Sequence, residues 1–336
     1  MRQTRQKRQQ IEGRIMMFET SQQAKLYFMS LLFMISPDKP IVIVEGTTDY
    51  MALRNVFKAT ILPVYDPHAK IDPGFTVTNN RQLVVEMARW LRQEKKPRHE
   101  NFVAIIDADY DRIDSVLDEE TNNGMLSLER QYEKIHVFLT DWHDLDVHVF
   151  FATIDDFIDR KLRKNAFRPF VMKKRIGRYD WKDALREILF EAALQIGLVR
   201  LTLHRHHISQ RVIPKQVSNA KFIDTELNVM IDDAIAAAVE GTNYDLSTIR
   251  SEYDRLSSDD RMKGTSNMDV YLNVINGHDL LRILGLCIIG RHGSKPATLN
   301  WAEKSVPIIM RKTYSLEHFR NSKLYQRLSR FMDLLF

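Results

Sequence analysis

Residues 40–49 read Pro-Ile-Val-Ile-Val-Glu-Gly-Thr-Thr-Asp, an apolar run followed by an acid, a glycine and a second acid. The β-branched run at 41–44 favours a strand, and an uninterrupted apolar strand is typical of a parallel sheet covered on both faces. Gly46 allows a tight turn, and the threonines after it can cap a helix over about 49–58. The stretch therefore predicts the strand, turn and helix that open an α/β domain.

The same alternation continues along the chain. We expect further strands at 61–65, 102–106 and 135–139, with helices over 24–36 and 78–95. From about residue 150 the apolar spacing is helical, over 181–196, 224–239, 267–289 and 314–334. The predicted fold is α/β, with a Rossmann-like, mostly parallel sheet and flanking helices, followed by a mainly helical C-terminal domain. We place a basic N-terminal arm at 1–22, the α/β domain at 23–150 and the helical, partly basic domain at 151–336.

Composition narrows the class of protein. The chain has 336 residues, of which 44% are hydrophobic, and a single cysteine, so neither an intramolecular disulfide nor a cysteine-rich zinc site is possible. No apolar run approaches the roughly 18 residues that cross a bilayer, and no secretory signal is visible. We expect a cytoplasmic protein without a membrane partner.

The net charge of +5 conceals a separation of charge along the chain. Residues 102–159 hold fifteen acidic residues against three Lys and Arg, whereas residues 160–178 hold nine Lys and Arg and no acid. Such a pattern suits a protein that holds cations and contacts a polyanion, although two separately solvated faces would give the same pattern.

Acidic residues follow three of the predicted strands. Glu45 ends the first strand and Asp49 follows four residues later, while Asp107 and Asp109 follow the strand at 102–106. Ligand sites of parallel sheets lie at the carboxyl ends of the strands, so these acids should meet there. If the chain stays extended after the strand, Asp107 and Asp109 lie on one side. Asp146, after the last strand, is a further candidate ligand.

Several carboxylates this close cannot all remain ionised without a cation. Oxygen ligands alone favour Mg²⁺ or Mn²⁺ over zinc, and Mg²⁺ in such a site keeps water and substrate phosphates among its ligands. We therefore predict a metal site built from Glu45, Asp49, Asp107, Asp109 and Asp146. Capping of a helix is an equally good interpretation of Asp49.

The order of these motifs resembles the TOPRIM domain of topoisomerases, bacterial primases and OLD nucleases. That domain has a Glu after its first strand and an Asp-x-Asp after a later one, which Glu45, Asp107 and Asp109 match over roughly residues 40–150. In OLD-like members an Asp four residues after the Glu is also a ligand, as Asp49 would be. The resemblance implies a metal-dependent endonuclease in which the catalytic residues are Glu45, Asp107 and Asp109.

A narrower resemblance is carried by the segments at 143–146, His-Asp-Leu-Asp, and at 276–281, Asn-Gly-His-Asp-Leu-Leu. With the chain length, they look like the TOPRIM effector subunits of PARIS anti-phage systems. That family implies a toxin that cleaves transfer RNA and is held by a separate ABC-type ATPase. No Gly-x-x-x-x-Gly-Lys-Ser/Thr loop is present here, so an ATPase would have to be another chain.

The basic residues suggest where nucleic acid could be bound. The candidates are Arg168, Lys173, Lys174, Arg175, Arg178 and Arg205. Phe167, Phe170 and Tyr179 are interleaved with them and could stack on unpaired bases. A docking surface for an acidic protein is the alternative. The apolar spacing of 314–334 could serve either core packing or self-association, and we expect the active form to be a homodimer.

Three other functions stay open at this point. Asp107-Ala108-Asp109 could belong to a haloacid-dehalogenase phosphatase, although Asp111 stands where that family has a Thr. The chain could also be an OLD-like DNA nuclease or a TOPRIM module that binds without cutting. Of the other acids, Asp111, Asp141 and Asp144 are expected to be supporting or surface groups rather than ligands. His143 could protonate a leaving group or contact phosphate, but a structural role is the expectation, and the histidines at 204–207 are expected to lie on a phosphate-facing or solvated surface.

Overall fold

Four parallel strands form the sheet of the computed structural model, in the order β2-β1-β3-β4. They are β1 (Ile41–Val44), β2 (Thr60–Pro63), β3 (Phe102–Ile106) and β4 (Val137–Leu139). The structure describes residue 35 and residues 39–64, 80–93, 101–113, 119–175, 180–213, 217–262, 272–331 and 335. All four predicted strands are confirmed to within two residues. The predicted arm at 1–22 and, apart from residue 35, the helix at 24–36 lie outside the described residues.

The two central strands fix the geometry of the sheet. Ile41 of β1 is in register with Thr60 of β2 on one side and Phe102 of β3 on the other, and β4 extends the sheet beyond β3. Every residue of β1 and β3 is buried, as expected for strands covered on both faces. The carboxyl ends of β1 and β3 therefore lie side by side.

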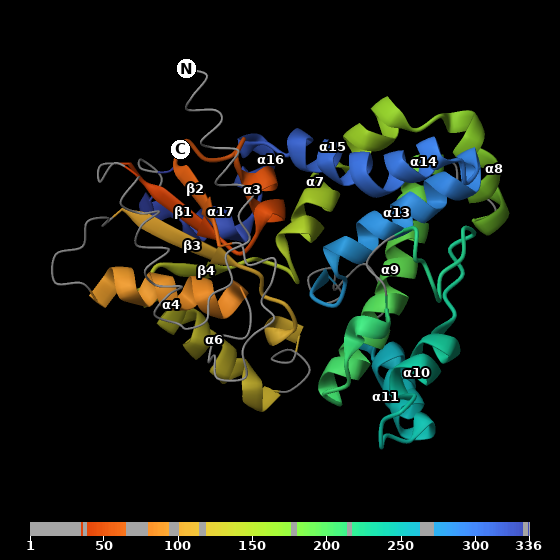
Figure 1. Ribbon diagram of the computed structural model, residues 1–336, viewed down its shortest axis with the longest axis horizontal. Coiled ribbons are helices and arrows are strands. Elements are labelled where there is room, and N and C mark those ends of the chain that lie inside the picture. Colours follow the sequence, from red (N-terminus) through yellow and green to blue (C-terminus); the bar gives the residue numbers. More distant parts are fainter. Residues whose placement is uncertain are drawn as a thin grey trace.

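The two faces of the sheet pack against different parts of the chain. Helices α4 (Asn80–Gln93) and α6 (Glu119–Lys134) cover one face (Figure 1). Alternate strand residues on that face, such as Ile43 and Ala104, share a core with α4. On the other face, Val44 and Ile105 join a second core that runs without a break into the helical half. The helix α3 (Thr47–Leu53) belongs to this second face, with Ala52 and Leu53 buried.

The helical half begins with α7 (Leu145–Lys161), so the domain boundary predicted at 150 falls inside a helix. The longer helices after it are α8 (Lys164–Lys174), α9 (Trp181–Arg205), α10 (Ile231–Val239), α11 (Leu246–Ser258) and α13 (Gly277–His292). Then come α14 (Pro296–Asn300), a π-helical turn (Trp301–Ser305), α15 (Val306–Thr313), α16 (Leu316–Arg320) and α17 (Lys323–Arg327). Short 3-10 turns cover Gln210–Val212, Asp260–Met262 and Ser329–Phe331. The chain is an α/β unit joined to a helical one by a continuous core.

The end of the chain returns to the sheet. The ring of Phe331 packs at 6.0 Å from that of Phe138 in β4, and Leu335 accepts a hydrogen bond from the Lys58 backbone. The single helix predicted at 314–334 is wrong, because Ser322 caps a new helix by accepting a hydrogen bond from the Tyr325 N–H. The apolar residues of this segment are buried within the chain, in agreement with the interpretation that they serve core packing. Among the described residues, no helix is long and apolar enough to span a membrane.

Candidate functional site

The candidate site lies where β1, β3 and β4 end. Glu45 follows β1 directly, and its Oε1 accepts a hydrogen bond of 2.8 Å from the Asp107 backbone N–H. Asp107 follows β3, and its Oδ1 accepts one of 3.1 Å from the Leu145 N–H, at the start of α7. Two backbone hydrogen bonds therefore join the ends of three segments around the Glu45 and Asp107 carboxylates. The prediction that these two acids meet is confirmed.

Asp49 lies in the first turn of α3 and takes part in its cap. Its Oδ2 accepts a hydrogen bond of 3.0 Å from the Gly46 N–H, and Gly46, rather than a threonine, is the N-cap residue. Both interpretations of Asp49 are therefore relevant, since the carboxylate caps the helix and also lies among other acids. The capping interaction between Gly46 and Asp49 therefore fixes the position of the Asp49 carboxylate.

Asp109 is placed differently from what we predicted. The strand ends at Ile106, and Asp109 has a φ of 47°, so the extended alternation expected for residues 107–109 is wrong. The backbone is held by a hydrogen bond of 2.7 Å from the Asp109 N–H to the His143 carbonyl. The Asp109 side chain is 51% exposed and lies 3.5 Å from Arg81, which also pairs with Asp111. Asp109 thus lies at the solvent side of the site.

Glu45, Asp49 and Asp107, here called the inner acids, have pKa values raised by desolvation and by repulsion between their charges. Desolvation, with the charges of Asp109 and Asp49, raises the pKa of Glu45 to about 8. Desolvation, with the charge of Asp146, raises the pKa of Asp49 to about 7. The pKa of Asp107 is raised by burial and by Asp49 and Glu45. In the absence of a cation, these three carboxyls therefore keep their protons to a higher pH than ordinary carboxyls do.

The three inner acids have no close basic partner within the part of the chain that the structure describes. Arg81 and Arg311 lower the pKa of Glu45 and Asp49 from a distance, but each is paired with another acid. Among the described residues, no group of three or more His, Cys, Asp or Glu side chains is already arranged to hold a metal ion. The carboxylates are instead turned toward backbone N–H groups or Arg81.

Asp146, predicted as a fifth ligand, is instead compensated by an arginine. Arg311 of α15 donates to both of its carboxylate oxygens, with Nε 2.8 Å from Oδ1, and the His278 Nδ1 lies 3.5 Å away. A carboxylate held at both oxygens has little capacity left for a cation. We therefore assign Asp146 to joining α7 with α15.

A second buried acid, Asp144, joins α7 to α13. It caps α7 by accepting a hydrogen bond of 2.9 Å from the Val147 N–H, and it accepts another of 2.9 Å from the Gly277 N–H. Burial alone would raise the pKa of Asp144, but its hydrogen bond with His143 and the charge of that ring lower it to about 2. Gly277 has to be a glycine, because a Cβ there would lie 2.4 Å from the Asp144 Oδ1. The segments at 143–146 and 276–281 are thus in contact.

The predicted nucleic-acid-binding residues at α8 lie apart from the acids, whereas Arg205 follows His204, whose ring lies 4.7 Å from that of Tyr110, beside Asp109. Arg168 is exposed on α8, at the opposite end of the molecule from the sheet (Figure 1). The other predicted residues that the structure describes each contact a residue of another segment. These pairs are Lys173 with Glu226, Lys174 with Asn228, Arg175 with Glu191 and Arg205 with Glu252. Arg178 and Tyr179 lie outside the described residues. The prediction that Phe167 and Phe170 stack on bases is wrong, because they are 0% and 3% exposed and pack in the core.

Comparison with known proteins adds no relative. No protein-family model matches the chain, and no curated protein or solved structure does. Sequence reasoning did not identify Arg81 and Arg311, the arginines that decide which acids are compensated. Neither stands in a motif, and each is brought to its acid by the fold alone.

Proposed function

We propose that this chain is a divalent-metal-dependent phosphodiesterase that cuts nucleic acid. One observation carries the proposal: Glu45, Asp49 and Asp107 lie half-buried and close together at the ends of parallel strands, without an ion pair to a described basic residue. Burying like charges together is costly unless they bind a proton or a cation. A divalent cation with a phosphate bound to it would relieve that repulsion.

The donor set fits such an ion by its chemistry. Glu45, Asp107 and Asp109 would hold it with Asp49, and all their donor atoms are carboxylate oxygens, as Mg²⁺ and Mn²⁺ prefer. When bound, the ion would supply charge stabilisation for a phosphate oxygen and a more acidic water. Because no described group is already arranged for a metal, Glu45 and Asp49 would have to leave their backbone partners.

Glu45 is the residue to which we assign proton transfer. In the metal-free site its pKa is raised to about 8, so before a cation binds the carboxyl can take up and release a proton near neutral pH. Its hydrogen bond from the Asp107 N–H holds it beside the other carboxylates. Asp109, which is half exposed and lies beside Arg81, would meet the substrate first.

The finer parts of the proposal rest on the resemblance to the TOPRIM effectors of PARIS systems. They are a TOPRIM fold, RNA and in particular transfer RNA as the substrate, a toxic role in anti-phage defence, restraint by a separate ABC-type ATPase and a homodimeric active form. The four-stranded parallel sheet is compatible with that fold, and the contact between residues 143–146 and 276–281 gives both quoted segments one structural role.

The direct test uses Glu45→Gln, which keeps an oxygen for the Asp107 N–H but removes the charge. Purified wild-type and variant proteins are incubated with total RNA and with plasmid DNA, with Mg²⁺, Mn²⁺ or a chelator. We expect metal-dependent cleavage of RNA by the wild type, and a loss of about 10²–10⁴-fold in the variant. The matched control is Glu317→Gln, on the exposed surface of α16, which should cleave like the wild type.

The outcomes separate the alternatives. Metal-dependent cleavage of plasmid alone would favour a DNA nuclease of the OLD class. Cleavage by Glu45→Gln at the wild-type rate would refute the assignment of the site. No cleavage together with no metal binding would leave a module that binds without cutting. Expression in cells gives a second measurement, because toxicity should be lost with Glu45→Gln and kept with the control.

A further inference from the structure

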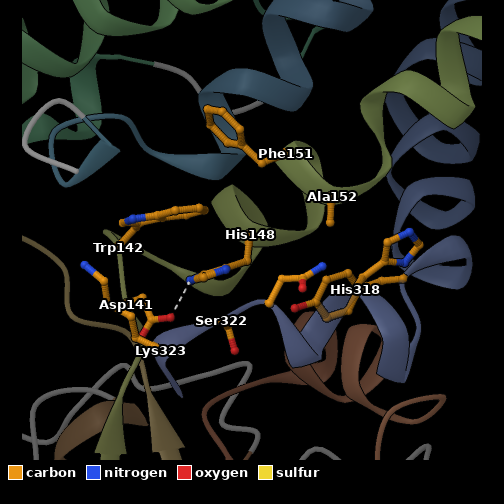
Figure 2. Close-up of a pocket in the computed structure, with 10 residues that line it drawn as sticks. Asp141, Trp142, His148, Phe151, Ala152, His318, Ser322 and Lys323 are labelled. Carbon is orange, nitrogen blue, oxygen red and sulfur yellow. Dashed lines mark ion pairs between the residues drawn. The ribbon is translucent and has the colours of Figure 1, made fainter. Parts of the chain in front are cut away.

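A second cavity lies beside the end of β4, between α7 and the helices at the end of the chain (Figure 2). Its volume is about 410 Å³, within the range of about 300–1,000 Å³ that holds small ligands. The residues from the loop after β4 and from α7 are Asp141, Trp142, His148, Phe151 and Ala152, and those from the last helices and their caps are Tyr314, His318, Asn321, Ser322 and Lys323. The cavity is separate from the acid cluster.

Aromatic rings contribute to both walls of this cavity. On one wall the indole of Trp142 stacks on His148, with ring centroids 4.1 Å apart and planes at 15°, and the Phe151 ring lies 5.4 Å from that of Trp142. On the opposite wall Tyr314 and His318 are nearly parallel, at 11°. Such a lining favours a flat ring, which can lie against aromatic faces at little cost in ordering.

One buried polar atom beside the cavity makes no hydrogen bond to a described residue. His148 is 7% exposed, and its Nε2 faces the Asp141 Oδ2 at 3.6 Å, with which it forms an ion pair only when the ring is protonated (Figure 2). Asp141 itself is engaged, because its oxygens accept from the Leu324 N–H at 2.9 Å and from Arg327 at 2.9 Å. A buried ring nitrogen that makes no hydrogen bond within the protein is a group that a ligand can satisfy.

The rim of the cavity is polar and positively charged. Asn321 and Lys323 are exposed there, bringing an amide, which donates and accepts, and an ammonium group. Figure 2 shows Lys323 close to Asp141 and Trp142. A ligand that fits both parts would have a flat, hydrogen-bonding ring inside and an anionic group at the mouth.

We propose that this cavity binds one nucleobase, with its phosphate toward Lys323 and its ring among the aromatic side chains, where it hydrogen bonds to His148. The base can belong to a free nucleotide or to an unpaired residue of RNA, and the second source rests on the proposed nuclease function. The cavity and the acids are joined by residues 140–145. Trp142 lines the cavity, and three residues later the Leu145 N–H holds the Asp107 carboxylate.

The test measures binding without cleavage. AMP, GMP, CMP and UMP are titrated into the full chain in a chelator by calorimetry, with ribose 5-phosphate as the probe that lacks a base. We expect at least one nucleotide to bind and ribose 5-phosphate not to bind. Ala152→Phe, which fills the cavity, should weaken the binding by at least about tenfold. Asp156→Phe, one turn along α7 and outside the lining, should leave it unchanged.

Two further variants keep the test decisive. Asn321→Trp blocks the exposed rim if Ala152→Phe does not fold, and His148→Phe keeps a ring on Trp142 while removing Nε2. Both should weaken binding by about tenfold. A short single-stranded RNA that competes with the nucleotide would identify RNA as a source of the base, and a lack of competition would identify the free nucleotide. Binding of no nucleotide, equal binding of ribose 5-phosphate, or binding unaffected by all cavity variants would overturn the proposal. Because a chelator is present, none of these results depends on cleavage.

Discussion

Two groups of acids lie away from solvent in this molecule, one buried and one half-buried, and the fold compensates only the first with arginines. Asp146 and Asp279 are each held by an arginine from another helix, Arg311 and Arg200. At the strand ends, Glu45, Asp49 and Asp107 receive single backbone hydrogen bonds and no ion pair with a described basic residue. Arginines therefore neutralise Asp146 and Asp279, but no described arginine or lysine pairs with the inner acids at the strand ends. That difference favours a functional role for the second group.

The compensated group should be the costlier one to disturb. Asp279 is 0% exposed and holds Arg200 through two hydrogen bonds, of 2.6 and 3.1 Å. Arg200→Met leaves this carboxylate buried with its main partner gone, so we expect a loss of about 3–5 kcal/mol in the free energy of unfolding. Urea denaturation at pH 7 measures it.

A surface arginine provides the control for this comparison. Arg250 pairs with Asp232 and Asp254, both more than half exposed, so Arg250→Met should cost less than about 1 kcal/mol. Equal losses for the two arginine variants would mean that the Asp279 pair is no more than a surface contact. The contrast between the two groups of acids would then disappear.

Removing a charge from the uncompensated group should raise the stability of the protein, by less than the loss expected for Arg200→Met. The pKa of Asp49 is raised to about 7 from an ordinary value of 3.8, so the folded protein binds the extra proton and metal-free stability falls as the pH rises between these values. Asp49→Asn removes the charge and still accepts from the Gly46 N–H. We expect the variant to gain over the wild type from pH 4 to 7, and to melt a few °C higher at pH 8, since each kcal/mol is worth about 2–4 °C.

The matched substitution at the neighbouring acid should act in reverse. Asp146→Asn leaves Arg311 with a neutral partner, so its melting temperature should fall at both pH 5 and pH 8. Thermal melts of the three proteins in a chelator give the comparison. A lower melting temperature for Asp49→Asn at pH 8 would contradict the view that its charge is uncompensated.

The sheet could be predicted from sequence because its signals are local. The apolar runs at 41–44 and 102–106 are buried on both faces, and in a parallel sheet the acids directly after them lie close together. The return of the C-terminus could not be predicted, because it depends on contacts such as Arg327 with Asp141 and Phe331 with Phe138, which join residues far apart in the chain.

The site was predictable to the same extent. The positions of Glu45 and Asp107 follow from the strand order alone. The position of Asp109 depends on a left-handed backbone conformation, with φ of 47°, which an Asp tolerates but which its sequence does not predict. Asp146 looked like a ligand because its partner, Arg311, is 165 residues away in the sequence. Sequence patterns show where charges gather but not which of them the fold neutralises.

Metal binding tests the central claim most directly. Mn²⁺ is titrated into the metal-free protein by calorimetry, with Asp107→Asn as the variant and Asp233→Asn, at an exposed position on α10, as the control. We predict that the wild type and the control bind Mn²⁺ alike and that Asp107→Asn binds it at least about tenfold more weakly. No Mn²⁺ binding by the wild type, or equal binding by Asp107→Asn, would contradict a cation site at the strand ends.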